Sequence, residues 1–468
     1  MTCARVRAPY RMNLPQGLEG IIRDLRDAGF RAVVVGGAVR DALLGLEPKD
    51  FDIEVYGISY DGLAAFLACY GHVDLVGKSF GVVKFEGVDF SVPRRESKTG
   101  AHHRDFLATF DESITPKDAA SRRDFTINAM AYDPLTGEVV DFFGGQEDLK
   151  NRVLRATSPA FSEDPLRVLR GMQFACRFDL RLEAETAAQC RALVNEYGTI
   201  AKERIGEEFR KWAEKSTRPG RLIEYLNDSG WMVHFPELHA LEGVPQDPDW
   251  HPEGDVATHT MLVVDQAVRV ADGASLGGDD RAVLVFAALC HDFAKATTTQ
   301  LREREGRMRW TSWGHEAAGG PMAHAFLERI GIKSAIVDQV VPLVENHLAH
   351  SNIGKEVSPR AVRRLAMRLA PAGIVQLAHL IEADASGCPP RPGGLPEGAR
   401  RLLEVAQEQA VEKKPQAPLI LGRHVMPYFA DLAGPHIGVV TAAAYEAQAD
   451  GVFSTEAEAL EWLARNMK

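Results

Sequence analysis

Residues 33–57, VVVGGAVRDALLGLEPKDFDIEVYG, place a glycine pair between two apolar runs. The pattern predicts a β-strand, a turn at Gly36 and Gly37, the start of a helix, and a second strand that carries Asp50 and Asp52. Side chains two residues apart on a strand point to the same face of the sheet. The segment therefore predicts an α/β arrangement that holds two carboxylates side by side.

Paired carboxylates suit two Mg²⁺ ions on a triphosphate, because this hard cation prefers oxygen ligands. Gly36 and Gly37 allow backbone amides to approach phosphate oxygens at the start of a helix. Arg40, one turn into that helix, can hold a phosphate oxygen bidentately. We therefore predict a nucleotidyl-transfer site in which Asp50 and Asp52 are catalytic and bind Mg²⁺. The alternative is an ordinary strand-to-helix turn with a surface arginine.

Short β-rich runs alternate with helices up to about residue 151, which predicts a mixed sheet covered by helices. From about residue 162 the apolar residues recur at helical spacing, so the rest is predicted to be all-α and the fold class α+β. The predicted parts are an N-terminal extension and helix (1–30), an α/β head (31–155), a helical base-recognition and neck region (156–242), a histidine-rich domain (250–386) and a C-terminal helical segment (399–468).

Composition restricts the compartment and the partners. The net charge of −11 argues against a generally basic coat for nucleic acid, although local basic patches can still bind phosphates. No apolar run approaches the ~18 residues of a membrane helix, and the basic N-terminus lacks the apolar segment of a secretory signal. The six cysteines form no C-x-x-C pair, which suits reduced thiols. We therefore expect a cytoplasmic protein without a membrane segment.

A second group of polar residues lies in SRRDFTINAMAYDP, residues 121–134. Arg122 and Arg123 supply two positive charges next to Asp124, and Asn128 follows four residues later in a helical run. We expect Asp124 to orient one of the two arginines through an ion pair. The alternative is a pair of arginines on the solvated surface.

A third group lies in residues 158–178, where Asp164, Arg167 and Arg170 recur every three residues and form one stripe of a helix. Cytosine and adenine each present an amino donor beside a ring-nitrogen acceptor, whereas uracil and guanine present the reverse. The side chains of Asp164 and Arg167 would accept C and A but reject U and G, because an unpaired buried polar group costs ~1–3 kcal/mol. The alternative is a helix cap followed by two solvated arginines.

At these three groups the chain resembles the class II tRNA nucleotidyltransferases, the bacterial CCA-adding enzymes of the DNA polymerase β superfamily. The matching strings are GGAVRDALLG with KDFD, RRDFTINA, DFFGGQEDLKNRVLR and SPAFSEDPLRVLR. The resemblance implies a polymerase-β-like head that adds or repairs the 3′-terminal CCA of tRNA from CTP and ATP without a template. It also implies that Asp50 and Asp52 hold the catalytic Mg²⁺ ions.

The same resemblance assigns Arg122 or Arg123 to the nucleotide. The chain departs from the family at Gln173, because members of the family often have a third arginine at this position, one turn after Arg170. The predicted nucleotide-binding residues are Gly36, Gly37, Arg40, Arg122, Arg123, Asp164, Arg167 and Arg170, with Asn128 as a further candidate.

Histidines recur along the predicted helices of residues 250–386, in THTMLVVD, ALCHDFAK, GHEAAGG and ENHLAH. An adjacent His-Asp pair with another histidine upstream suits a divalent metal, although a lone histidine is more often a surface residue. The pattern resembles the HD phosphohydrolase superfamily, which implies phosphatase, 2′-nucleotidase and 2′,3′-cyclic phosphodiesterase activity with Ni²⁺ or Mg²⁺. The expected ligands are His259, His291 and Asp292, with His315, His347 and Asp384 as further candidates. The alternative is a helical domain that only extends the tRNA-binding surface.

Other functions fit parts of the same pattern. Poly(A) polymerases share the first two motifs, and enzymes that add only CC or only A share the architecture and differ in loops such as the basic segment 94–106. A non-catalytic RNA-binding protein, or a hydrolase with a regulatory head, would also keep this scaffold. The paired acids Asp50 and Asp52 favour catalysis, since a simple RNA binder gains nothing from acids beside phosphates. We expect a monomer or homodimer with tRNA, CTP and ATP as partners.

Overall fold

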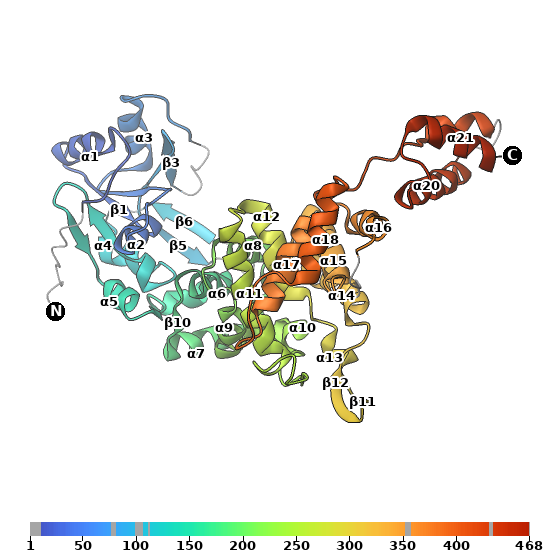
Figure 1. Ribbon diagram of the computed structural model, residues 1–468. Helices are drawn as coiled ribbons and strands as arrows, with labels where there is room; N and C mark the ends of the chain where they lie inside the picture. Colours follow the sequence, from blue (N-terminus) through green and yellow to red (C-terminus); the bar gives the residue numbers. More distant parts are fainter. Residues whose placement is uncertain are drawn as a thin grey trace. The chain divides into compact units, whose positions relative to one another are not determined.

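The computed structural model describes residues 11–75, 81–98, 106–110, 113–351, 357–429 and 434–467. The chain divides into two compact units, which Figure 1 shows in the colours of the sequence. The first unit comprises Met1–Glu208 and Glu224–His234, and the second comprises Phe209–Ile223 and Phe235–Lys468. Helices α8 (Lys202–Lys215) and α9 (Arg221–Ser229) contribute residues to both.

The first unit is built on a six-stranded mixed sheet with the strand order β3-β4-β2-β1-β7-β8. Strand β2 pairs parallel with β4, and the other neighbours pair antiparallel. The strands of the sheet are β1 (Arg31–Val35), β2 (Asp52–Tyr56), β3 (Val82–Phe85), β4 (Val88–Ser91), β7 (Ala131–Asp133) and β8 (Glu138–Val140). Two smaller pairs are the hairpin of β5 (Arg94–Lys98) with β6 (Phe106–Phe110), and the parallel pair of β9 (Val153–Leu154) with β10 (Arg181–Leu182).

The central strands β1 and β2 are buried at every position after the first, as expected for strands covered on both faces. Helix α1 turns Leu18, Ile21, Ile22 and Leu25 inward and packs on β1. The helices of this unit are α1 (Leu18–Asp27), α2 (Gly37–Leu43), α3 (Tyr60–Ala68), α4 (Pro116–Ser121), α5 (Gly145–Lys150), α6 (Leu166–Phe178) and α7 (Ala184–Ala192), with 3-10 turns η2 (Thr126–Asn128), η3 (Pro159–Glu163), η4 (Val194–Thr199) and η5 (Trp231–His234).

The second unit is helical, with α11 packed against α12 and α17, and α14 packed against α15. Its last helices, α19 to α21, form a small apolar core of their own. The helices are α10 (Pro236–His239), α11 (Val256–Gly273), α12 (Gly278–Cys290), α13 (Lys295–Thr298), α14 (His315–Arg329), α15 (Ser334–Asn346), α16 (Pro359–Leu369), α17 (Ile374–Ser386), α18 (Glu397–Glu408), α19 (Gly422–Val425), α20 (Pro435–Ala449) and α21 (Glu456–Asn466), with the 3-10 turn η6 (Met426–Tyr428).

The predicted α+β fold class, with a mixed sheet followed by helical parts, is confirmed. The prediction of purely helical parts was wrong in two places. Strand β10 follows α6, and a hairpin of β11 (Gln300–Arg304) and β12 (Arg307–Thr311) interrupts the histidine-rich domain. Segment 94–106, expected to be a loop, begins and ends in the paired strands β5 and β6, and residues 99–105 lie outside the described part.

Among the residues that the structure describes, none of the helices combines the length and the apolar character that spanning a bilayer requires.

Candidate active sites

The acidic pair lies where β2 begins. Asp52 is the first residue of β2, opposite Val35 of β1 and Asp89 of β4, and Asp50 lies two residues earlier in an irregular segment. Loss of water around the carboxylate raises the pKa of Asp52, Arg123 opposes this shift, and the charges of Asp89 and Asp50 reinforce it. Neighbouring carboxylates that repel one another in this way are the oxygen-rich donor set that Mg²⁺ prefers, so these residues fit the predicted ions.

The glycine turn brings a cation to the same place. Gly36 has a φ of +73°, which favours glycine, and a Cβ there would lie 3.0 Å from Nη1 of Arg123 and 3.7 Å from Oδ2 of Asp52. Arg123 also lies 3.7 Å from Glu54, measured from Nη2 to Oε1. The structure therefore brings Gly36, Asp52 and Arg123 together, and Gly37 begins α2 directly beside them.

The side chain of Arg40 is more buried than expected for an arginine that binds a phosphate. Its side chain is 5% exposed and lies over the ring of Phe178 at 4.4 Å. Nη1 donates to Oδ1 of Asn128, while Nε and Nη2 both donate to Oδ1 of Asp41. Among the described residues, three of the five N–H groups of its guanidinium have acceptors. Arg40 and Asn128 thus form one connected pair behind the glycine turn.

The predicted partner of Asp124 was wrong. Asp124 pairs with Arg170 of α6, whose Nε lies 2.8 Å from Oδ2, and not with either adjacent arginine. Burial alone would raise the pKa of Asp124, but this ion pair and a hydrogen bond from Asn128 outweigh it and lower the pKa. Arg122 instead pairs with Glu163 at 2.9 Å. The three motifs are therefore connected, because Asp124 accepts from Arg170 of α6 and from Asn128, and Asn128 in turn accepts from Arg40.

Replacing Arg170 with Met should destabilise the first unit by about 2 kcal/mol, because the carboxylate of Asp124 would stay buried without its partner. Removing one partner of a fully buried pair costs ~3–5 kcal/mol, and the 36% exposure of the Arg170 side chain reduces this through solvent screening. Since folding lowers the pKa of Asp124, the contribution is fully present above pH ~3.9 and is lost as the pH falls through the folded-state pKa.

Amide hydrogen exchange in α6 measures this loss. Exchange should be faster in Arg170→Met than in the unsubstituted protein, and the difference between the two rates should become smaller in acid. The matched control is Arg181→Met, which removes an exposed arginine of the same unit. Unchanged α6 exchange in Arg170→Met would contradict a stabilising role for the pair.

The predicted base-reading residues lie at the start of α6. Oδ1 of Asp164 accepts from the backbone N–H of Leu166 at 3.0 Å, and Oδ2 lies 3.2 Å from Nη2 of Arg204 on α8. Arg167 donates to the carbonyl oxygens of Ala160 and Arg122 at 2.7 and 2.9 Å. These contacts fix the orientation of both side chains.

Gln173 does not take the place of the missing arginine at the surface. Its side chain is 3% exposed, and its Nε2 is buried without a hydrogen-bond partner among the described residues.

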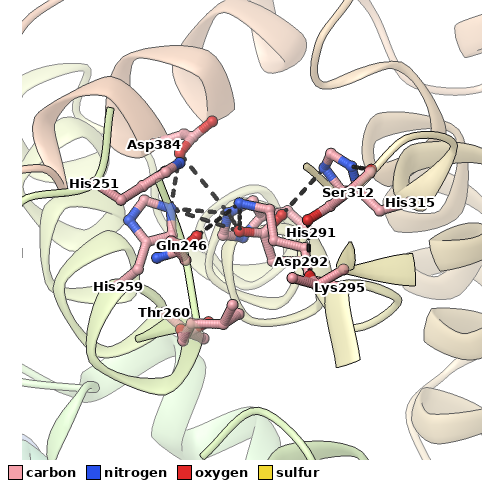
Figure 2. A network of polar contacts seen from close by, with 12 residues as sticks. Gln246, His251, His259, Thr260, His291, Asp292, Lys295, Ser312, His315 and Asp384 are labelled. Atoms are coloured by element: carbon pink, nitrogen blue, oxygen red, sulfur yellow. Dashed lines mark hydrogen bonds and ion pairs between the residues drawn. The ribbon is translucent and has the colours of Figure 1, made fainter. Parts of the chain in front are cut away.

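The second site is a buried cluster of imidazoles and carboxylates in the second unit (Figure 2). His259 comes from α11, His291 and Asp292 follow α12, and Asp384 comes from α17. Nε2 of His259 lies 3.3 Å from Nε2 of His291 and 3.0 Å from Oδ1 of Asp384, and Nε2 of His291 lies 3.1 Å from Oδ2 of Asp292. Nε2 of His259, Nε2 of His291 and Oδ1 of Asp384 are therefore close enough to hold one ion, and Oδ2 of Asp292 lies beside them.

The other oxygen of Asp292 belongs to a second group. His315 begins α14 and His347 follows α15. Nε2 of His315 lies 3.2 Å from Oδ1 of Asp292 and 3.2 Å from Nε2 of His347. Both oxygens of Asp292 are buried, and each faces a different pair of histidines, Oδ2 facing His259 and His291 and Oδ1 facing His315 and His347. Two groups could each hold an ion, one of His259, His291 and Asp384 and one of Asp292, His315 and His347. Oδ2 of Asp292 also lies beside His291, so this carboxylate borders the first group as well.

Hydrogen bonds set the tautomer of every histidine in the cluster. Nδ1 of His291, His315 and His347 lies 2.8, 2.6 and 2.7 Å from the backbone carbonyls of residues 288, 312 and 344. A carbonyl oxygen accepts only, so each Nδ1 must carry the proton and each Nε2 is left to coordinate. Burial lowers the pKa of His347 to about 3, with His291 and His315 adding to the shift, so this imidazole is neutral. The cluster therefore fits divalent metal ions.

Family models match both sites. One described as "Poly A polymerase head domain" matches residues 32–155, and one described as "HD domain" matches residues 256–384. The multifunctional CCA protein of Xanthomonas campestris is 37% identical over 370 residues, which cover 76% of this chain and 85% of that protein. The multifunctional CCA protein of Pasteurella multocida is 37% identical over 348 residues, which cover 73% of this chain and 79% of that protein. The chain belongs to the multifunctional CCA protein family.

As a multifunctional CCA protein, the chain is an enzyme of the nucleotidyltransferase class that carries an HD domain, and both domains imply divalent metals. The crystal structure of the Bacillus stearothermophilus CCA-adding enzyme in complex with CTP matches with a TM-score of 0.62 at 21% identity, covering 96% of this chain and 97% of that one. That likeness shows a common fold and confirms the polymerase-β-like head predicted from the sequence.

The sequence patterns did not indicate several residues that the structure places at the two sites. Nδ1 of His259 donates to Oε1 of Glu253 at 2.8 Å, which directs Nε2 of His259 toward the cluster. Burial alone would raise the pKa of Glu253, but hydrogen bonds from His251 and His259 lower it to about 2. Nζ of Lys295 lies 2.8 Å from Oδ2 of Asp292. The other missed residues are Asp89, Arg204, Gln246 and Cys388.

Spacing alone could have indicated some of them. Lys295 follows Asp292 by three residues, the separation of neighbours on one helical face, and Cys388 follows Asp384 by four. Asp89 gives no such signal, because its position opposite Asp52 depends on which strands are neighbours in the sheet.

Proposed function

We propose that the head of this protein adds and repairs the 3′-terminal CCA of tRNA, with CTP and ATP as substrates and no nucleic-acid template. The observation that carries this is Asp52 at the start of β2, held against the glycine turn and Arg123, in a chain of the multifunctional CCA protein family. Asp50 and Asp52 would hold Mg²⁺, and Asp89 on the neighbouring strand is a third carboxylate for the same ions. Ions in such a pair stabilise the attacking and leaving oxygens of a phosphoryl transfer.

Base selection is assigned to Asp164 and Arg167. Both side chains are held by protein contacts before a nucleotide arrives, so neither must be ordered at the moment of binding. A carboxylate and a guanidinium fixed in this way would favour C and A, because U and G would leave buried donors and acceptors unpaired. Arg122 and Arg123 are assigned to the nucleotide, and Gly36, Gly37, Arg40, Asn128 and Arg170 support the same site.

For the HD domain we propose hydrolysis of phosphate esters, including 2′,3′-cyclic phosphodiesters, 2′-nucleotides and phosphomonoesters. His259, His291, Asp292 and Asp384 would hold one divalent ion, and Asp292, His315 and His347 a second, with Ni²⁺ or Mg²⁺ as the proposed metals. Bound ions of this kind polarise a phosphate oxygen and lower the pKa of a water molecule. Lys295, beside Asp292, is placed to contact a phosphate.

Extension of a tRNA that lacks its last three nucleotides tests the head. With CTP and ATP together we expect growth by C, C and A and then a stop, and with CTP alone growth that stops after two residues. Open-ended growth with ATP alone would indicate a poly(A) polymerase, and a stop after CC, or addition of a single A only, an enzyme of split function. No incorporation would contradict the proposal for the head and leave the HD domain as the active part.

The organisation of the chain is part of the proposal. The matches to residues 32–155 and 256–384 support a head at 31–155 and an HD domain at 250–386, with a neck region at 156–242 and a tail at 399–468. A tRNA substrate supports a cytoplasmic location, and we propose a monomer or homodimer.

A further inference from the structure

A cavity opens next to the HD cluster. Its volume is about 470 Å³, which is within the ~300–1,000 Å³ usual for small-molecule sites. Lys295 and His315 contribute to its wall, and Figure 2 shows both beside Asp292, the carboxylate that the two groups of histidines share. A ligand in this cavity would therefore have one end against the metal-binding residues.

Tryptophans line the other part of this cavity. Trp250, Trp310 and Trp313 are 60%, 37% and 59% exposed, and they are three of the six tryptophans of the chain. Large aromatic side chains gain most from burial, so three exposed ones around a single cavity indicate a binding surface.

The hairpin that carries Trp310 is not needed to build the core of the domain. Neither β11 nor β12 has a buried residue. Arg309 of β12 is tied to Asp247 and Asp249 at 2.9 and 2.8 Å, which anchors the hairpin to the segment that carries Trp250. The hairpin is therefore held in place at the cavity while contributing nothing buried of its own.

Positive charge lies around the tryptophans. Arg304 lines the cavity and has no ion pair within the described residues, and Arg302 lies over the ring of Trp313 at 4.5 Å. Nζ of Lys295 lies on the side of the metal-binding residues. A ligand that matches these features has a flat ring at one end and a phosphate at the other.

We propose that Trp250, Trp310 and Trp313 form a stacking surface for the base of a nucleotide whose phosphate is hydrolysed at the HD cluster. The proposal rests on the hydrolase function proposed above and specifies its substrate as a nucleoside phosphate, either free or at the 3′ end of an RNA chain. Stacking on tryptophan tolerates every base, because every base has a π-face, so we expect little base preference.

Two substrates that share the reacting group test the surface. The first is 2′,3′-cyclic AMP, and the second is glycerol 1,2-cyclic phosphate, which has the same cyclic diester but no base. Trp310→Ala and Trp313→Ala should each raise KM for 2′,3′-cyclic AMP about 5- to 150-fold, the equivalent of ~1–3 kcal/mol per stacked base. They should leave kcat for that substrate, and kcat/KM for the glycerol ester, unchanged. Equal losses on both substrates, or none on either, would overturn the proposal.

Met308→Ala is the matched control. Met308 is 59% exposed on the same strand as Trp310 and does not line the cavity. Met308→Ala should therefore leave kcat and KM for both substrates unchanged. An RNA oligonucleotide ending in a 2′,3′-cyclic phosphate separates the two sources of the ligand. If Trp310→Ala and Trp313→Ala raise KM for the oligonucleotide as they do for 2′,3′-cyclic AMP, the surface stacks the end of an RNA chain. If they raise KM for 2′,3′-cyclic AMP alone, the surface stacks free nucleotides only.

Binding separates a failure of this inference from a failure of the hydrolase proposal. Quenching of tryptophan fluorescence by 2′-AMP needs no turnover, and the chain has no tryptophan before Trp212, so the head contributes little to the signal. Quenching that is lost in Trp310→Ala, together with no hydrolysis of any ester, would support the stacking surface and contradict the hydrolase function. No quenching by 2′-AMP in the unsubstituted protein would overturn the surface itself.

Discussion

Asp52→Asn should lower the rate of nucleotide addition at least ~10³-fold while leaving ester hydrolysis by the HD domain unchanged. The substitution keeps the size of the side chain and removes the negative charge that faces Asp89 across the sheet. Metal ions supply several kcal/mol of transition-state charge stabilisation, and each 1.36 kcal/mol is tenfold in rate. Incorporation of labelled CTP into a tRNA without its CCA end, measured under single-turnover conditions, reports the chemical step.

Glu47→Gln is the matched control. It removes one negative charge from an exposed position three residues before Asp50, so it tests whether a general loss of charge near the site is sufficient. Burial, reinforced by the charges of Asp89 and Asp50, raises the pKa of Asp52, so folding disfavours its charged form. Removal of this charge should therefore not destabilise the fold, and both variants should unfold at the temperature of the unsubstituted protein. Addition by Asp52→Asn within tenfold of that protein would contradict a metal-binding role.

The local pattern around the head site was predictable because it depends on neighbouring residues. Strands β1 and β2 and the turn at Gly36 follow from an apolar run, a glycine pair and a second apolar run within 25 residues. The contact between Asp124 and Arg170 was not predictable in this way, since the two residues are 46 positions apart and two arginines lie closer in sequence. Which cation a buried carboxylate selects depends on how the helix packs.

The hairpin beside the HD cluster was missed for a different reason. Five of the ten residues in its two strands are charged, so the segment lacks the run of β-branched and aromatic residues that indicates a strand. In its turn Glu305 and Gly306 both have positive φ, as the commonest two-residue hairpin turn requires. Gly306 was the signal of this turn in the sequence, because glycine accepts positive φ readily. The histidines of the cluster were predictable as candidate ligands from their residue type, but their division into two groups around Asp292 depends on where the end of α12, the start of α14 and the end of α15 meet.

The shared carboxylate predicts that Asp292→Asn affects two ions at once. The unsubstituted protein should bind two equivalents of Ni²⁺ in the HD domain, and Asp292→Asn should bind neither tightly, because one negative charge serves both groups. Hydrolysis of a phosphodiester should fall at least ~10³-fold, since the ions supply most of the electrostatic stabilisation of the reacting phosphate. Nucleotide addition by the head should not change.

His347→Gln separates the two groups, because this residue belongs only to the second. Metal analysis after dialysis should find one equivalent of Ni²⁺ in His347→Gln, held by the group that contains His259 and His291. The matched control is His324→Gln on α14, whose side chain is 55% exposed and lies 3.9 Å from Glu328, and it should keep both equivalents. A single equivalent in the unsubstituted protein, with full hydrolysis in His347→Gln, would show that Asp292 serves one ion and that His315 and His347 are structural.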